Sequence, residues 1–182
     1  MTVSEKYKEI FNQDFNPDPN DIHRFSNYYK TLMEKMGVKT STYKLKYISL
    51  FSGIGGFEVA IHSIFPNAEC VGFSEIKKPA LSVYKTHFPD HLNLGCVKDI
   101  TKEQIQNLVK EKGCDLIVGG FPCKNLSSIS RITKTDSGLD GPKSGLFYYM
   151  KEIIQYVTEI NPNLDLMIEN NASMSKHWKG VI

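Results

Sequence analysis

The sequence contains very little arginine. Arg24 and Arg131 are the only two arginines in a chain of 182 residues that carries 22 basic side chains. Arginine is the usual side chain for bidentate readout of guanine in the DNA major groove. The formal net charge is +2, whereas many nucleic-acid-binding domains are strongly basic. The chain therefore has few of the side chains that proteins use to read a base sequence.

Metal-binding patterns and long apolar runs are also missing. The cysteines form no C-x-x-C pair and no histidine cluster has zinc spacing, so we expect no metal site. No apolar run approaches the ~18–20 residues that span a bilayer, and the polar, charged first residues do not form a secretory signal. We expect an intracellular chain, outside the membrane, with four reduced cysteines: Cys70, Cys96, Cys114 and Cys123.

The length fits one domain with an appendage. Residues 1–45 are predicted to form a helical N-terminal extension, in which Asp21 caps a helix that Gly37 ends. Its tyrosines and phenylalanines favour packing onto the main domain; a surface for nucleic acid or for another chain is the alternative. Residues 46–182 are predicted to form the main domain.

Short apolar runs alternate with helical patterns from residue 46 onward. This alternation predicts right-handed crossovers and a mainly parallel sheet with helices on both faces, an α/β fold. Ligands of such sheets bind beyond the carboxyl ends of the strands. The expected strands are Tyr47–Phe51, Glu69–Ser74, Leu92–Val97, Leu116–Gly119 and Leu164–Ile168, and the expected helices are Phe57–Phe65, Pro79–His87, Lys102–Lys112 and Gly145–Ile160.

A glycine-rich turn, Phe51–Gly56, follows the first expected strand and opens the first helix. Glu75 ends the second strand, where an acidic residue commonly accepts hydrogen bonds from ribose hydroxyls. The position three residues after Gly55 is Glu58 rather than glycine, and a carboxylate at the mouth of the helix would repel a pyrophosphate. The pattern therefore favours a ribosyl cofactor without phosphate over NAD or FAD. A tight strand–helix turn without any ligand is the alternative.

Two further strand ends carry reactive or polar side chains. Cys123 lies on a loop punctuated by glycine and proline after the fourth strand, where Lys124 favours the thiolate. Glu169 ends the fifth strand, so a nucleophile and an acid are expected at one edge of the sheet. Asp99 follows the third strand and is suited to accept a hydrogen bond from an adenine amine, between Ile76 and Ile100; the alternative for Asp99 is a helix-start residue.

In order and spacing, the glycine turn, Glu75, Asp99, the Gly-Phe-Pro-Cys loop and the Glu-Asn step resemble the motifs of DNA (cytosine-5)-methyltransferases. The resemblance covers roughly residues 46–175 and implies the Rossmann-like fold of methyltransferases that depend on S-adenosyl-methionine, here truncated after the fifth strand. It implies transfer of a methyl group to carbon 5 of a flipped-out cytosine in double-stranded DNA, as in restriction–modification systems. The donor would be S-adenosyl-methionine.

The resemblance also implies roles for individual residues. Cys123 would add to carbon 6 of cytosine, and Glu169 would hydrogen-bond the ring nitrogen and amine. Residues 124–144 would form a mobile catalytic loop. The implied cofactor-binding residues are Phe51, Ser52, Gly53, Gly55, Gly56, Glu75, Ile76, Asp99, Ile100 and Gly119, and the implied substrate-binding residues are Pro122, Ser127 and Asn170.

The sequence departs from the family in three places. Lys124 replaces the usual glutamine after the catalytic cysteine, and Asn171 replaces the usual valine. The later arginine-bearing strand motif, the target-recognition region and the closing motif have no counterpart before Ile182. We therefore expect little activity from the isolated chain, and we expect the recognition region either on a second polypeptide or in a missing C-terminal half.

Other functions remain open at this point. A catalytically inactive binding or regulatory module of the same fold is one alternative, and a relative that methylates cytosine in transfer RNA is another. A nicotinamide oxidoreductase is disfavoured by Glu58. The expected location is the cytoplasm of a bacterial or phage-infected cell, or the nucleus if the source is a eukaryote.

Overall fold

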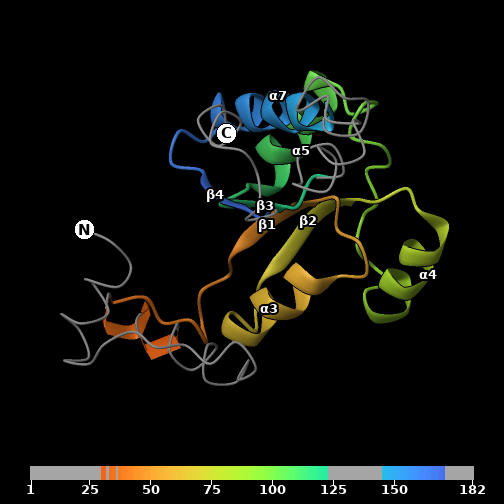
Figure 1. The fold of residues 1–182 in the computed structure, drawn as a ribbon. Coiled ribbons are helices and arrows are strands. Elements are labelled where there is room, and N and C mark those ends of the chain that lie inside the picture. Colours follow the sequence, from red (N-terminus) through yellow and green to blue (C-terminus); the bar gives the residue numbers. More distant parts are fainter. Residues whose placement is uncertain (1–29, 32, 36, 123–144, 171–182) are drawn as a thin grey trace, which may run out of the picture. The chain divides into compact units, whose positions relative to one another are not determined.

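The computed structural model describes residues 30–31, 33–35, 37–122 and 145–170. Its centre is a parallel four-stranded sheet in the order β2-β1-β3-β4 (Figure 1). The strands are β1 (Lys46–Leu50), β2 (Glu69–Ser74), β3 (Leu116–Gly119) and β4 (Asp165–Ile168). All four were expected within one residue at each end, and the parallel α/β fold is confirmed.

Burial along the strands follows their place in the sheet. The two central strands, β1 and β3, are buried except at their first residues, as expected for parallel strands covered on both faces. The edge strand β4 differs, because Asp165, Leu166 and Met167 are all exposed. The described sheet thus ends at an open edge that carries apolar side chains.

Four helices follow the expected pattern: α3 (Gly56–Ile64), α4 (Lys78–His87), α5 (Lys102–Lys112) and α7 (Leu146–Thr158). Helix α5 begins with the predicted cap. The Thr101 hydroxyl accepts the Gln104 backbone N–H, and the Gln104 side chain accepts the Thr101 N–H, a reciprocal capping box. Pro79 lies in the first turn of α4, where its missing N–H removes no helical hydrogen bond.

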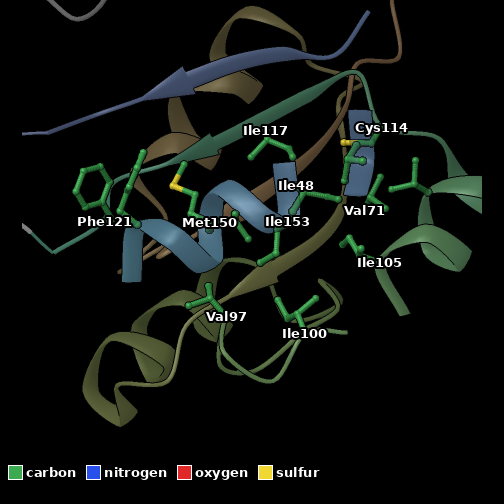
Figure 2. Packing of buried hydrophobic residues seen from close by; sticks show 14 residues of the cluster. Ile48, Val71, Val97, Ile100, Ile105, Cys114, Ile117, Phe121, Met150 and Ile153 are labelled. Atoms are coloured by element: carbon green, nitrogen blue, oxygen red, sulfur yellow. The ribbon is translucent and has the colours of Figure 1, made fainter. Parts of the chain in front are cut away.

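The main hydrophobic core lies between the sheet and helices α5 and α7 (Figure 1). Figure 2 shows Ile48 and Ile117 from the sheet meeting Ile105 of α5 and Met150 and Ile153 of α7. Ile48 and Ile117 are partners in the register of β1 and β3. They therefore point to the same face, which is the face that α5 and α7 cover.

Helix α4 packs on the opposite face. Phe73 is the register partner of Ser49, and side chains alternate along a strand, so Phe73 points away from the face that Ile48 occupies. The Tyr84 ring of α4 stacks on Phe73 with 3.9 Å between the ring centroids. The prediction of helices on both faces is thereby confirmed.

One predicted strand, Leu92–Val97, is wrong. Only an isolated bridge pairs Asn93 with Phe73: the Phe73 N–H donates to the Leu92 carbonyl, and the Leu94 N–H donates to the Phe73 carbonyl. The extended conformation then stops, because Gly95 has a φ of +79° and its N–H donates to the Asn93 side chain. The described sheet therefore has four strands rather than five.

The chain divides into two compact units, one of residues 1–44 and 60–68 and one of residues 45–59 and 69–182. The first contains the Tyr43 and Phe65 rings, with centroids 6.1 Å apart, and the second contains the whole sheet. The expected domain division at residue 46 stays a prediction. None of the helices in the described ranges combines the length and the hydrophobicity that a membrane crossing requires.

Candidate functional site

The glycine turn begins directly after β1 and has an unusual backbone. Phe51 is the one described non-glycine residue with a positive φ, +57°, and Gly53 (+58°) and Gly55 (+98°) are also left-handed. Hydrogen bonds between backbone groups help hold the turn: the Ser52 N–H donates to the Ser74 carbonyl, and the Gly55 N–H donates to the Ser52 carbonyl. A left-handed phenylalanine carries strain, so its place is fixed by these surroundings.

The glycines differ in what surrounds them. A Cβ atom at Gly55 would lie 2.7 Å from the Phe88 ring, so this glycine allows the turn to pack against α4 and the residue after it. A Cβ atom at Gly53 or Gly56 would meet nothing within 4 Å. The turn is therefore closely packed at Gly55 and open at Gly53 and Gly56, where a ligand has room to approach the backbone.

The Glu75 carboxylate joins this turn to the segment after β2. Its Oε2 accepts the Gly53 N–H at 2.9 Å, and its Oε1 accepts the N–H groups of Ile76 and Lys77, both at 2.8 Å. A carboxylate oxygen has about two acceptor sites, so Oε1 is filled and Oε2 can accept one more donor. Glu75 is only 9% exposed, and its remaining acceptor site suits one hydroxyl group.

The three residues expected around an adenine lie in different surroundings. Ile76 is 62% exposed, and Asp99 is an exposed turn residue whose N–H donates to the Cys96 carbonyl. Ile100 belongs instead to the hydrophobic core and is 9% exposed (Figure 2). The roles of these three residues towards an adenine stay a prediction. Ile100 has little exposed surface with which to contact a ligand.

Two residues that the sequence did not single out anchor the segment leading to Asp99. The Ser74 hydroxyl donates to the Gly95 carbonyl at 2.6 Å. The Asn93 side chain accepts the Gly95 N–H and donates to the Glu75 carbonyl. The signal available in the sequence was Asn93 two residues before a glycine, a common turn pattern.

Glu169 lies against the segment that leads to Cys123. Its N–H donates to the Gly119 carbonyl at 2.9 Å, and the Asn170 side-chain amide donates to the Phe121 carbonyl at 3.2 Å. A Cβ atom at Gly120 would lie 2.8 Å from Glu169 Oε2. Gly120 was not predicted as a site residue, because the need for a glycine there becomes visible only when β3 and β4 are known to be neighbours.

Cys123 and Ser127 lie outside the described residues, and Pro122 is the last described residue before them. The expected meeting of the Cys123 thiol and the Glu169 carboxylate therefore stays a prediction. The described neighbour of that carboxylate is Gly120, three positions before Cys123 in the sequence. Gly119 itself is tightly enclosed, since a Cβ atom there would lie 2.8 Å from the Leu50 carbonyl oxygen.

The interpretation of Glu58 as a carboxylate at the helix mouth is wrong. Glu58 is fully buried, and its Oε1 accepts the Tyr84 hydroxyl at 3.0 Å. Burial, followed by electrostatic interaction with Cys70 and Glu58, raises the pKa of Tyr84, so this hydroxyl keeps its proton. Glu58 points into the protein, so its carboxylate says nothing about repulsion of a pyrophosphate.

These features form a chemically consistent cradle for a nucleoside, with room beside its ribose for a further group. The glycine backbone is open at Gly53 and Gly56, Glu75 keeps one acceptor site, and Ile76 offers an exposed apolar surface. The residues present therefore fit the adenosyl cofactor that the motifs imply. Among the described residues, no group of three or more His, Cys, Asp or Glu side chains is placed to hold a metal ion.

Comparison with known proteins points in one direction. The family model described as C-5 cytosine-specific DNA methylase matches residues 45–182. The orphan methyltransferase M.Rho11sI of Bacillus phage rho11s is 36% identical over 139 residues, which are 75% of this chain and 25% of the phage protein. The type II methyltransferase M.HpaII of Haemophilus parainfluenzae is 32% identical over 137 residues, 75% of this chain and 34% of that enzyme.

Solved structures agree on the fold. DNMT2 from Spodoptera frugiperda, solved as a mutant, superposes with a TM-score of 0.53 at 25% identity, covering 71% of this chain and 36% of that chain. Dnmt2 from S. pombe gives a TM-score of 0.52 at 20% identity, covering 76% of this chain and 38% of that chain. The chain thus spans about a quarter to a third of the length of the two curated relatives.

Proposed function

Because the chain belongs to the C-5 cytosine-specific DNA methylase family, we propose that it is the cofactor-binding and catalytic half of a DNA (cytosine-5)-methyltransferase. The observation that carries the proposal is the placement of Glu169. Its carboxylate lies beside Gly120, just ahead of Pro122-Cys123. The glycine turn held by Glu75 follows β1, and β1 pairs in parallel with β3. The turn and the segment before Cys123 therefore both lie at the carboxyl ends of the strands.

The proposed cofactor is S-adenosyl-methionine, which supplies an electrophilic methyl group when bound. The backbone of Gly53, Gly55 and Gly56, with Phe51 and Ser52, would hold its methionine part. Glu75 would accept a ribose hydroxyl at the acceptor site that Oε2 retains. Ile76 and Asp99 would contact the adenine, and Ile100 would support that contact from the core. Gly119, which has no side chain, would allow the end of β3 to pack closely against β1 beside the cofactor.

The chain's own chemistry would begin with Cys123. Its thiolate adds to carbon 6 of cytosine, forming a C–S bond and turning carbon 5 into a nucleophile. Glu169 donates a proton towards the ring nitrogen, where negative charge would otherwise build up; loss of one such donor typically costs ~10²–10³ in rate. After carbon 5 is methylated, a base removes its proton and the C–S bond breaks, which returns the thiolate.

The proposed substrate is double-stranded DNA from which the cytosine is flipped out, at a cost of about a few kcal/mol. Pro122, Ser127 and Asn170 would contact the base. Asn170 already donates to the Phe121 carbonyl, which ties the step after β4 to the loop before Cys123. The relatives M.Rho11sI and M.HpaII come from a phage and a bacterium, which favours action in the cytoplasm of a bacterial or phage-infected cell.

We also propose that turnover requires polypeptide in addition to these residues. The relatives are three to four times longer than the matched part, and the described sheet ends at β4 with Leu166 48% and Met167 52% exposed. Such an apolar strand edge is normally covered or paired. A second polypeptide carrying the target-recognition region would cover it and supply the phosphate contacts on which DNA affinity depends.

Cofactor binding tests the first part of the proposal. Calorimetry with S-adenosyl-homocysteine and, separately, NAD should give saturable binding only for the former. Glu75→Ala should abolish that binding, since it removes the ribose acceptor and the anchor of Gly53. Saturable NAD binding, or no binding of S-adenosyl-homocysteine by the wild-type chain, would contradict the proposed cofactor.

Methyl transfer tests the second part. Radiolabelled methyl transfer to DNA should be weak with the chain alone and robust after addition of a polypeptide that carries the regions present in the relatives. Cys123→Ala and Glu169→Gln should each remove that activity while leaving cofactor binding intact. Robust turnover by the chain alone would refute the need for a partner. Activity that survives Cys123→Ala would refute the covalent route, and labelling of transfer RNA instead of DNA would reassign the substrate.

A further inference from the structure

The buried carboxyl group of Glu58 is not used by the proposed chemistry. Glu58 is the third residue of α3, the helix that opens directly after the glycine turn. An acidic residue at this position commonly turns back to bond the helix start. Here the side chain is fully buried and is met by Tyr84 of α4 instead.

The hydrogen bonds around Tyr84 fix a direction. The Tyr84 hydroxyl has one proton, which it donates to Glu58 Oε1 at 3.0 Å. The Nδ1 atom of His91 lies 3.0 Å from the same hydroxyl oxygen, so Nδ1 must carry a hydrogen and donate it. A chain of donors thus runs from His91 through Tyr84 to Glu58. Within the described part of the protein, Glu58 Oε2 has no hydrogen-bond partner, so Tyr84 is the one described donor to this buried carboxyl group.

The same tyrosine supports the glycine turn from below. A Cβ atom at Gly55 would lie 3.4 Å from the Tyr84 ring and 2.7 Å from the Phe88 ring. Tyr84 is held by stacking on Phe73, and Phe88 is stacked on His91 with 5.0 Å between the ring centroids. Gly55 therefore sits on an aromatic shelf, Phe73, Tyr84, Phe88 and His91, and Glu58 is bonded to that shelf three residues later.

We propose that Glu58 and Tyr84 are positioning residues for the cofactor site: their hydrogen bond fixes the start of α3 on the aromatic shelf and so sets the conformation of the glycine turn. This rests on the proposed function, in which the turn holds the cofactor. The turn leaves Phe51, Gly53 and Gly55 in left-handed conformations, which persist only where surrounding contacts determine them. Glu75 holds the turn at Gly53, and the Glu58–Tyr84 pair holds its other end.

Two conservative variants and one control test this. Tyr84→Phe keeps the ring and removes the hydroxyl, and Glu58→Met keeps a side chain of similar length and removes the carboxyl oxygens that accept this hydroxyl. Tyr156→Phe is the matched control, because Tyr156 belongs to α7, which packs on the other face of the sheet. Affinity for S-adenosyl-homocysteine is measured by calorimetry well below each unfolding midpoint, so that a fall in global stability alone does not change it.

We expect Tyr84→Phe and Glu58→Met each to weaken S-adenosyl-homocysteine binding by about 2- to 10-fold, the range that one hydrogen bond typically represents. Tyr156→Phe should leave it unchanged. The double variant should be no weaker than the weaker single variant, because both changes remove one interaction. Wild-type affinity in both single variants would overturn the proposal, even if their unfolding midpoints fell.

Amide hydrogen exchange gives a readout without cofactor. The Gly55 and Val59 amides, which bond to the Ser52 and Gly55 carbonyls, should exchange about tenfold faster in both variants, an opening equivalent to ~1.4 kcal/mol. The Ile105 and Val109 amides of α5 should be unaffected. If the wild-type chain binds no S-adenosyl-homocysteine, the proposed function fails, and exchange alone decides whether the pair holds the turn. Unchanged exchange at Gly55 would then refute it.

Discussion

Glu75 gives the sharpest stability prediction, because its carboxylate hydrogen-bonds both the glycine turn and the segment after β2. The perturbation is Glu75→Gln, which preserves the shape. A glutamine can still accept the N–H groups of Ile76 and Lys77 with its carbonyl oxygen. Its NH₂ group then faces the Gly53 N–H, which donates to Glu75 Oε2 in the wild-type protein. One hydrogen bond is lost and two donors are brought together.

The magnitude follows from the burial of this group. Leaving a buried donor unsatisfied costs about 1–3 kcal/mol. Gly53 is half-buried, so water can approach its N–H and the lower part of that range applies, about 1–2 kcal/mol. For a protein of this size, 1 kcal/mol shifts the unfolding midpoint by about 2–4 °C. We therefore expect Glu75→Gln to unfold about 2–8 °C below the wild-type protein.

The assay is thermal unfolding followed by circular dichroism without cofactor. Glu159→Gln is the matched control: Glu159 is paired with Lys102 at an exposed site, and exposed ion pairs contribute little, so its midpoint should stay close to that of the wild-type protein. A Glu75→Gln midpoint within 1 °C of the wild-type value would refute the anchoring role. A fall that appears only with cofactor present would mean that Glu75 acts on the ligand alone.

Three further predictions concern other parts of the fold. Gly119→Ala should destabilise the protein strongly, because its Cβ atom would meet the Leu50 backbone oxygen. Gly120→Ala should leave the unfolding midpoint nearly unchanged and reduce methyl transfer in the complemented enzyme, because its Cβ atom displaces only the flexible end of Glu169. Equal midpoints for the two variants would contradict this. Thr101→Ala should cost about 1 kcal/mol through loss of the α5 cap, measured by urea unfolding, and no change in the midpoint would argue against the capping box. Burial raises the pKa of the Cys114 thiol to about 12, so the neutral thiol is favoured in the folded state. This stability is complete below the unfolded pKa of about 9 and should be lost as the pH rises towards 12. Cys114→Ala should lessen the loss of stability measured from pH 8 to 11 without removing it, since burial also raises the pKa of the Cys70 thiol, which contributes a loss over the same range, and an unchanged loss would contradict this.

Local chemistry made much of the fold predictable. Thr101 and Gln104 lie three residues apart, so the start of α5 can be inferred without tertiary structure, and the apolar runs of β1 and β3 mark buried strands. The run Leu92–Val97 was mistaken for a strand because Leu94 and Val97 pack in the core from a turn, which Asn93 and Gly95 stabilise. Side-chain hydrogen bonds of this kind leave little trace in hydrophobic periodicity.

The candidate site was predictable where it follows strand ends and not where it depends on contacts between distant residues. Glu75 and Glu169 were found because each follows a strand. Glu58 was misjudged because its partner, Tyr84, lies 26 residues away, so only the packing of α3 and α4 reveals that the carboxylate points inward. Gly120 was missed for the same reason, since its neighbour Glu169 comes from another strand.

The open edge at β4 has a consequence for control of the reaction. The strand is only four residues long and runs directly into Glu169, whose carboxylate lies against the backbone of Gly120. Any polypeptide that pairs with β4 would form backbone hydrogen bonds to the same short strand that leads to the proposed proton donor. Assembly would then change the position of the Glu169 carboxylate through the backbone of β4, without contact between the added polypeptide and the cytosine.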